Sequence, residues 1–285
     1  MQLMRILRIA VGAFVAALTA GIVRTVLRRR RTTEQPQALR RTATTDRRAV
    51  FTTDDLSGLP EPVQDYFANV LEEGQQYIKT VRLEQEGTLR VGDTDASWKQ
   101  FTATQYITTD PPGFFWDASM RLWPLITFQI RDFYRDGKGS ARVSLFGLIP
   151  VDGDETNPEL DEGELLRYLA EAVWYPTALL PSEGVEWEAV DKRSATATLE
   201  YGGASATLMF HFSEDDEVSK VYAEQRPRRV DDGYEPTPWT GRWQEYKTQN
   251  GMRIPTAGEV IWHLPDGDME AWRGKVTDIS YNDEA

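Results

Sequence analysis

The first regular feature of the chain is a helical spacing of apolar residues near residue 60. In residues 58–74, apolar side chains recur every three or four positions and fall on one helix face: Val63, Tyr66, Phe67, Val70 and Leu71. Pro62 suits the first turn of such a helix, and Gly74 is typical of a helix end. The spacing therefore predicts an amphipathic helix at the start of a folded domain.

A second helical pattern occupies the middle of the chain, before Pro176. Its predicted inner face is apolar and consists of Leu165, Leu166, Leu169, Ala170 and Val173. Acidic residues crowd its first turn, where the helix dipole favours negative charge, and the proline ends the pattern. We therefore expect a second buried helix here.

Elsewhere apolar and polar residues alternate with the period of β-strands. The predicted strands are residues 81–91, 98–107, 113–121, 126–134, 140–148, 185–190, 194–201, 204–212, 217–226, 239–247, 257–264 and 271–281. Turn signals such as Asp136-Gly137 and Asn250-Gly251 separate them, and no helical linkers intervene. The pattern predicts a β-rich α+β fold, with a meandering antiparallel sheet and two main helices.

An uncharged, mostly apolar run, Ile9–Val23, precedes this domain. It is short for a hydrocarbon core of about 30 Å, but flanking arginines can reach the membrane interface. We expect a transmembrane helix that contacts the membrane through residues 9–27. The alternative is a cleaved signal peptide, which Arg28–Arg31 disfavour because they follow the run where a cleavage site would lie.

Charge divides the chain into a basic arm and an acidic body. The first 50 residues hold eleven arginines and two acidic residues, whereas the whole chain has a net charge of −13. The acidic body argues against nucleic-acid binding. The heavier basic flank predicts a cytoplasmic position for the domain. Arg28–Arg31 predict contact with anionic lipid headgroups, or alternatively a solvated linker.

These features predict three parts: a membrane anchor with its basic flank (1–31), a disordered linker rich in arginine and threonine (32–52), and one acidic β-rich domain (53–285). The chain has no cysteine, which excludes disulfides and thiolate chemistry. The acidic, lysine-poor composition resembles that of halophilic proteins, in which dense carboxylates keep the surface hydrated.

Standard catalytic motifs are missing from the sequence, which has only two histidines, His211 and His263. Both alternate with apolar residues along predicted strands, as surface or edge residues do. We therefore expect neither a metal site nor a cofactor.

The best candidate site lies on the second helix. Arg167, Glu171 and Trp174 follow one another at helical spacing, away from the leucine-rich face. The arginine could hold an anionic headgroup while the indole contacts an apolar body. The alternative is a structural ion pair that docks the helix onto the sheet.

A second candidate is the end of a predicted strand, where Asp132 and Tyr134 share one face. They could border a cleft or simply lead into the hairpin at Asp136-Gly137. The tryptophans, with Trp116 among the candidate ligand-binding residues, could line a partly wet cavity or pack in the core.

The sequence also resembles a family of uncharacterised prokaryotic domains. The resemblance rests on GLPEPVQDYF (58–67), GFFWDA (113–118), RYLAEAVWYPTALLP (167–181) with Trp187, PWTGRW (238–243) and IPTAGEVIW (254–262). It implies no activity. At the level of fold, the long sheet with two helices resembles the curved half-barrels of lipoprotein-carrier and lipid-binding domains, which implies a concave face that holds an acyl chain.

Three functions remain open on these grounds. The first is a membrane-tethered, non-catalytic protein that binds a lipid or another amphipathic ligand. The second is a hydrolase or isomerase that uses Glu171 with Asp132 or Tyr134. The third is a structural or assembly protein at the membrane. The binding protein is preferred because it requires no missing motif.

Overall fold

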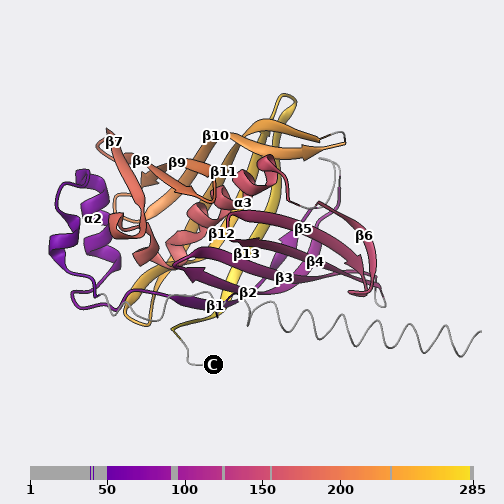
Figure 1. Ribbon diagram of the computed structural model, residues 1–285, viewed down its shortest axis with the longest axis horizontal. Coiled ribbons are helices and arrows are strands. Elements are labelled where there is room, and N and C mark those ends of the chain that lie inside the picture. The colour runs from indigo at the N-terminus through magenta and orange to yellow at the C-terminus, as the bar shows by residue number, and fades with distance from the viewer. Residues whose placement is uncertain are drawn as a thin grey trace, which may run out of the picture. The chain divides into compact units, whose positions relative to one another are not determined.

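The computed structural model describes Leu39, Arg41 and residues 50–90, 96–123, 126–154, 156–231 and 233–282 (Figure 1). Leu39 to Ala285 form one compact unit. The predicted anchor lies outside the described residues. Among the residues that are described, no helix has both the length and the apolar character needed to cross a membrane.

Thirteen strands form a single sheet. They are β1 (Thr80–Leu89), β2 (Lys99–Thr109), β3 (Pro112–Trp123), β4 (Ile126–Arg135), β5 (Lys138–Leu145), β6 (Ile149–Asp154), β7 (Val185–Asp191), β8 (Ser194–Tyr201), β9 (Ala204–Phe212), β10 (Val218–Val230), β11 (Gly233–Gln249), β12 (Met252–Leu264) and β13 (Gly267–Tyr281). The two described α-helices are α2 (Glu61–Val70) and α3 (Pro158–Glu171). Short 3-10 turns are η1 (Thr53–Leu56), η2 (Ala172–Trp174), η3 (Pro176–Leu179) and η4 (Pro181–Glu183).

The sheet is an antiparallel meander whose ends are joined by a helix. Its spatial order is β6-β5-β4-β3-β2-β1-β13-β12-β11-β10-β9-β8-β7, so hairpin neighbours pair throughout and β1 pairs with β13. The segment from β6 to β7, which contains α3, links the two edge strands. The predicted β-rich fold with an antiparallel sheet and two helices is confirmed.

The sequence patterns miss one strand and misplace one boundary of the folded region. The strand predicted over 140–148 ends at Leu145, because Phe146 and Gly147 form a turn, and β6 follows. Pro150 obscures β6 in the sequence, but proline is tolerated there because β6 is an edge strand. Phe51, which the sequence places in the linker, is only 1% exposed and belongs to the core.

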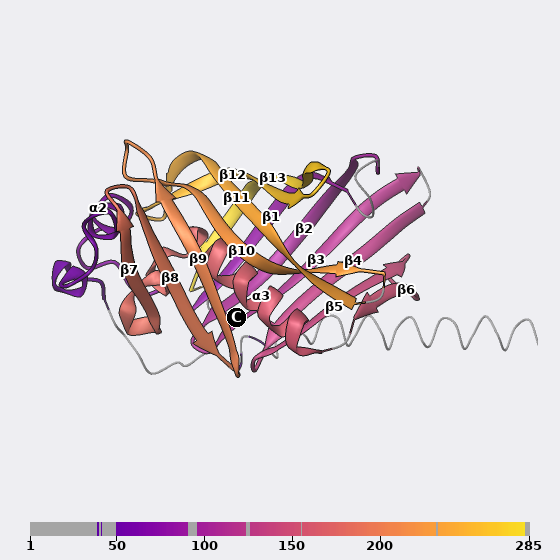
Figure 2. The same ribbon diagram turned by 90° about the horizontal axis from the view of Figure 1, so that it is seen from above.

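Helix α3 lies against the concave face of the curved sheet (Figures 1 and 2). Asn157 caps its first turn by accepting a hydrogen bond from the backbone N–H of Leu160, and Pro158 occupies the first helical position. One side of the helix contacts β9 and β10, and the other contacts β3, β4 and β5. Because both halves of the sheet pack on α3, its apolar stripe and much of its opposite face are buried.

The two halves of the sheet also touch each other directly around α3. The β4–β5 turn meets the β8–β9 turn at Gly137 and Gly202, where a Cβ on either residue would clash with the other backbone. Farther along, an Nη atom of Arg229 lies 2.9 Å from Asp152 Oδ1 in β6, and Tyr234 Oη donates to Asp154 at 2.6 Å. These contacts fix the curvature of the sheet around the helix.

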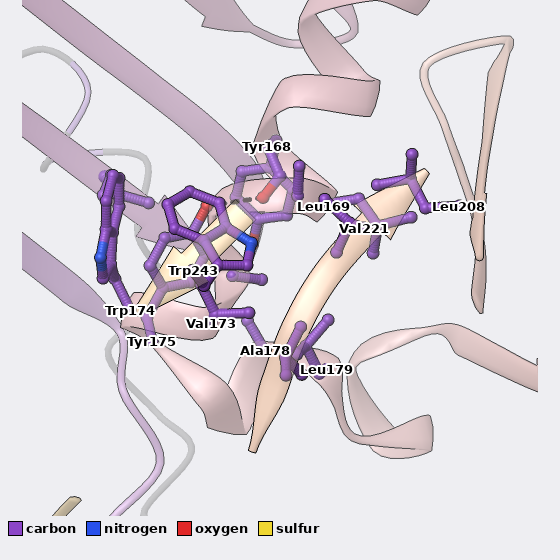
Figure 3. Close-up of a cluster of buried hydrophobic side chains, with 14 of the residues drawn as sticks. Tyr168, Leu169, Val173, Trp174, Tyr175, Ala178, Leu179, Leu208, Val221 and Trp243 are labelled. Atoms are coloured by element: carbon purple, nitrogen blue, oxygen red, sulfur yellow. Dashed lines mark hydrogen bonds between the residues drawn. The ribbon is translucent and has the colours of Figure 1, made fainter. Parts of the chain in front are cut away.

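One end of the concave face is filled by an apolar cluster that surrounds the C-terminal half of α3 (Figure 3). The cluster includes Tyr168, Leu169, Val173, Trp174, Tyr175, Ala178, Leu179, Leu208, Val221 and Trp243. Tyr175 Oη donates to the carbonyl of Tyr168 at 2.7 Å, so its buried hydroxyl is satisfied. This cluster is a solid core, and the open space of the molecule lies beside it.

Candidate functional site

A cavity of about 210 Å³ remains between α3 and the sheet. Its wall includes six tryptophans and is formed by Gln85, Trp116, Asp132, Arg167, Ala170, Glu171, Trp174, Arg226, Trp239, Trp243, Val260, Trp262 and Trp272. The helix side contributes Arg167, Ala170 and Glu171, with Trp174 in η2, which together form a stripe at helical spacing.

Arg167 is the centre of the charged part of this wall. Its Nη1 lies 2.6 Å from Asp132 Oδ2 on β4, and its Nε donates to Glu171 Oε1 at 2.8 Å. Gln105 Nε2 donates to the other Glu171 oxygen at 2.6 Å. The side chains of Arg167, Asp132 and Glu171 are 16%, 17% and 12% exposed, respectively. The network therefore places a largely buried salt-bridge triad at the edge of an apolar space.

Burial and pairing shift the pKa values of Arg167 and Asp132. The neighbouring carboxylates raise the pKa of Arg167 against the opposing effect of burial, so its charge is secure. Burial raises the pKa of Asp132 above its ordinary value, and the attraction of Arg167 opposes that rise. The Arg167 guanidinium also lies over two aromatic rings, 4.9 Å from the Phe114 centroid and 5.0 Å from that of Trp116.

Arg226 on β10 provides a second guanidinium in the wall. It lies 4.6 Å from the ring centroid of Trp239 and 5.5 Å from that of Trp262. Its Nη2 donates to the carbonyl of Gly163 at 3.2 Å, whereas its Nε has no partner among the described residues. Burial lowers its pKa to about 10, so it remains protonated at neutral pH.

Glu164 lies close to these charges on α3 but outside the cavity wall. Burial raises its pKa to about 8, with a further contribution from Asp132. Its Oε2 is buried and has no partner among the described residues. Glu164 is therefore mostly protonated at neutral pH.

The tryptophans of the wall differ in how their indole N–H groups are satisfied. Trp116 donates to Gln85 Oε1 at 2.8 Å, and Trp174 donates to the carbonyl of Pro255 at 3.0 Å. The indole N–H groups of Trp239 and Trp243 are buried without an acceptor among the described residues. A buried unpaired donor of this kind costs about 1–3 kcal/mol.

Glycines opposite these rings explain why the sheet can hold so many tryptophans. Gly87, Gly274 and Gly258 are direct neighbours across β1, β13 and β12, and Gly258 pairs with Trp243 on β11. A Cβ on Gly258 would lie 2.8 Å from Trp243 Cε3, and one on Gly274 would overlap the Trp272 ring. The indoles therefore lie flat over glycine backbone and leave the cavity beside them.

A larger hollow of about 660 Å³ lies on the opposite, outer face of the same strands. Many residues of its wall are charged, and several of them are paired, as in the contacts of Lys275 with Glu245 at 3.0 Å and of Glu259 with Arg242 at 2.9 Å. Lys275, Glu245 and Arg242 are about half exposed to solvent, so these pairs need no ligand. The tryptophan-lined cavity is therefore the stronger candidate, because its wall contains unmet polar groups.

The structure brings together five of the six residues that the sequence selects: Trp116, Asp132, Arg167, Glu171 and Trp174 all line the cavity. The sixth, Tyr134, is fully buried and packs against Phe114 and Tyr201 outside the wall.

Sequence reasoning missed Gln85, Gln105 and Arg226. The two glutamines interrupt the buried faces of their strands, and a polar residue at an inward position was the available signal. Arg226 gave no such signal, because a register shift between Ala223 and Arg226 breaks the alternation that would have placed it on the outer face.

In the part of the chain that is described, no three histidine, cysteine or acidic side chains lie close enough together to hold a metal ion. The wall can instead bury apolar groups, stack against planar groups and donate hydrogen bonds to an acceptor.

Comparison with known families identifies the class of protein. The chain belongs to the family of unknown function DUF6920, whose model matches residues 57–281. The membership in a family of uncharacterised domains that the motifs predict is thereby confirmed. A search of curated proteins finds no match.

Two solved structures resemble the fold. One is a LolA superfamily protein from Nitrosomonas europaea, with 9% identity and a TM-score of 0.37, covering 80% of this chain and 96% of that one. The other is a beta-barrel-like protein of the DUF1849 family from Brucella abortus, with 11% identity and a TM-score of 0.27, covering 73% of this chain and 99% of that one. These likenesses concern the fold alone.

Proposed function

We propose that this protein binds a small amphipathic ligand in the tryptophan-lined cavity, and that residues 9–27 tether the binding domain to a membrane. The observation that carries the proposal is an unfilled space of about 210 Å³ surrounded by six tryptophans, with a salt-bridge triad in its wall. Protein interiors are close-packed, so an empty space lined by such large side chains calls for a function.

The size of the cavity limits the apolar part of the ligand. At about 30 Å³ for each water molecule, the space would hold roughly seven waters. This volume suits a short acyl chain or a single ring system, or the end of a longer chain. A whole phospholipid does not fit inside it. Burial of each methylene against the indoles would contribute about 0.8 kcal/mol.

The unmet donors of the wall favour a ligand that carries acceptor oxygens. Arg226 Nε and the indole N–H groups of Trp239 and Trp243 all lack an acceptor among the described residues. Arg167 already holds two carboxylates, whereas Arg226 makes no ion pair within 4.0 Å in the described part of the chain. A carboxylate or ester at the polar end of the ligand would therefore bind on the Arg226 side.

The geometry argues against the enzyme alternative, because its proposed acid–base residue, Glu171, is already hydrogen-bonded within the protein. One oxygen of Glu171 accepts from Arg167 and the other accepts from Gln105, so both oxygens are already engaged within the protein. A general acid or base needs a free position facing the substrate. Of the two residues that could assist Glu171 in that hypothesis, Tyr134 lies outside the cavity wall, and Asp132 accepts a hydrogen bond from Arg167. Ligand binding is therefore the function that the geometry supports best.

Titration with octanoate tests the proposal through the intrinsic fluorescence of the cavity tryptophans. We expect saturable binding to the wild-type chain and a roughly 10–100-fold weaker affinity for Arg226→Gln, since one charge-assisted hydrogen bond contributes about 1.5–3 kcal/mol. The exposed Arg193 provides the matched control, and Arg193→Gln should bind like wild type. Absence of saturable binding, or equal affinity in both variants, would contradict the proposal.

A further inference from the structure

Exposed apolar side chains gather at the end of the sheet where β4 begins and β5 turns into β6. Ile126, Phe146, Ile149 and Val151 are 38%, 51%, 58% and 55% exposed. They are neighbours in the sheet, because the Phe146 N–H donates to the carbonyl of Thr127 at 2.8 Å and Leu145 pairs with Ile149. We refer to these four residues as the apolar tip.

Folding alone does not account for the apolar tip. Phe146 has a φ of +53°, a left-handed conformation that is unfavourable for a bulky residue, yet its ring is half exposed. Residues 144–151 carry no charge in a chain of which 27% is charged. An edge strand normally carries charges that protect it from association. The charges of the edge strand β6, Asp152 and Asp154, lie in its second half, so its first half, Ile149–Val151, remains suited to an apolar partner.

A row of apolar residues connects the tip with the cavity. Ile126, Phe128, Ile130 and Asp132 share the inner face of β4, and Asp132 belongs to the cavity wall. Phe128 and Ile130 pair with Leu145 and Val143 of β5, and all four are only partly buried. Helix α3 packs against β5 near Gly139, at the other end of these strands (Figure 2), and the row itself stays partly exposed.

We infer that the apolar tip docks into the surface of a lipid bilayer. The row behind it then offers an apolar path from the bilayer to the cavity, a part of the inference that rests on the proposed function. The partly exposed apolar row favours a bilayer over a protein partner, because an amphiphile that leaves the membrane needs such a path and a docked protein does not. Aliphatic and aromatic side chains without charge insert readily at the membrane interface.

The predicted anchor makes such docking geometrically accessible. Residues 24–38 separate the apolar run from Leu39, the first residue of the compact unit. Fifteen residues span at most about 50 Å, at roughly 3.4 Å each. A body held within this distance of a bilayer would need only a weak contact to keep the tip on the surface.

The lack of cysteine allows the docking to be tested on the full-length chain with single labels. The variants Ile149→Cys and Val190→Cys, each carrying an environment-sensitive fluorophore, are reconstituted into phosphatidylcholine vesicles with brominated acyl chains. Val190 is a matched control because it is 48% exposed and lies on β7, the opposite edge of the sheet. We expect at least threefold stronger quenching at position 149. Equal quenching at both positions, or none at 149, overturns the inference, including the case in which the tip binds a second copy of the chain.

A second measurement separates this inference from the proposed function. The double variant Phe146→Ser/Ile149→Ser removes the apolar tip without touching the cavity, so its octanoate affinity should stay within about twofold of wild type while its membrane contact is lost. If the wild-type chain binds no octanoate but position 149 is quenched, docking stands and the proposed function fails. If the chain binds octanoate but position 149 is not quenched, the proposed function stands and docking fails.

Discussion

Arg167 Nη1 lies 2.6 Å from Asp132 Oδ2, and this contact joins the central helix to the strand that runs from the cavity to the apolar tip. The same guanidinium holds Glu171 at 2.8 Å, so one side chain satisfies two largely buried carboxylates. Removing it would leave both carboxylates without their cation.

The variant Arg167→Ala should therefore be strongly destabilised. Loss of one partner from a buried ion pair typically costs about 3–5 kcal/mol, because the remaining charge is uncompensated. Urea unfolding with a constant m-value measures this loss. The exposed pair of Lys275 and Glu245 is the control, and Lys275→Ala should change the unfolding free energy by less than about 1 kcal/mol. A similar decrease in unfolding free energy for both variants would show that the buried ion pairs of Arg167 contribute no more to stability than an exposed pair.

Glu164 predicts a pH dependence of stability. Its pKa is raised to about 8 in the folded protein, from an ordinary value of 4.5, because it is buried. Between these values the folded state binds more protons than the unfolded state, so stability should decrease as the pH rises through this window. The slope due to this group is at most about 1.4 kcal/mol per pH unit.

The variant Glu164→Gln isolates this effect. Its free energy of unfolding, measured from pH 5 to pH 9, should lack the part of the decline that Glu164 causes in the wild type. Parallel curves for the two proteins would show that Glu164 is ionised in the folded state.

Two glycine-to-alanine variants should have opposite effects on stability: Gly258 lies beneath Trp243, and Gly163 lies in α3. In Gly258→Ala the new Cβ would meet Trp243 at 2.8 Å, so the ring must move at a cost of about 1–3 kcal/mol. In Gly163→Ala the nearest atom is 3.8 Å away, and alanine should stabilise α3 by about 0.5–1 kcal/mol. Thermal unfolding of both variants measures the contrast, and a loss of stability in Gly163→Ala would count against the helix geometry.

Replacing either of two wall tryptophans with phenylalanine should reduce the stability by different amounts. Trp116→Phe leaves Gln85 Oε1 without its donor, which costs about 1–3 kcal/mol beyond the lost ring volume. Trp239→Phe removes an N–H group that has no acceptor among the described residues. Trp116→Phe should therefore lose more stability in urea unfolding, and equal losses would indicate that the Trp239 N–H has a partner.

A larger side chain in the cavity should weaken ligand binding without lowering the free energy of unfolding. Ala170 lines the cavity, so Ala170→Leu should leave the free energy of unfolding within about 1 kcal/mol of wild type but weaken octanoate binding at least tenfold. Ala178 is equally buried but lies in the solid core, so Ala178→Leu should lose about 1–3 kcal/mol through overpacking. If both variants are destabilised alike, the space beside Ala170 is already filled.

The sequence predicts the elements of this fold better than the space between them. Alternation and turn residues suffice to place twelve of the strands, because local chemistry determines each hairpin. It misses β6, since Pro150 is acceptable only on an edge strand and edge position is a tertiary property.

The candidate site also has a part that local sequence predicts and a part that depends on the tertiary structure. Helical spacing brings Arg167, Glu171 and Trp174 to one face from sequence alone. Arg226 reaches the wall because a register shift between Ala223 and Arg226 reverses the alternation of inward and outward residues in β10. Register between distant strands is not readable from a single sequence, so this part of the wall could not be predicted.

The most direct test of ligand binding is a crystal soaked with octanoate that carries bromine at the end of its chain. Anomalous scattering locates the bromine without reference to any assumed pose. We predict a single bromine peak inside the cavity, among Trp116, Trp174 and Trp239, with the carboxylate toward Arg226. A cavity without a bromine peak, or a peak only on the outer surface of the sheet, would contradict the proposed binding function.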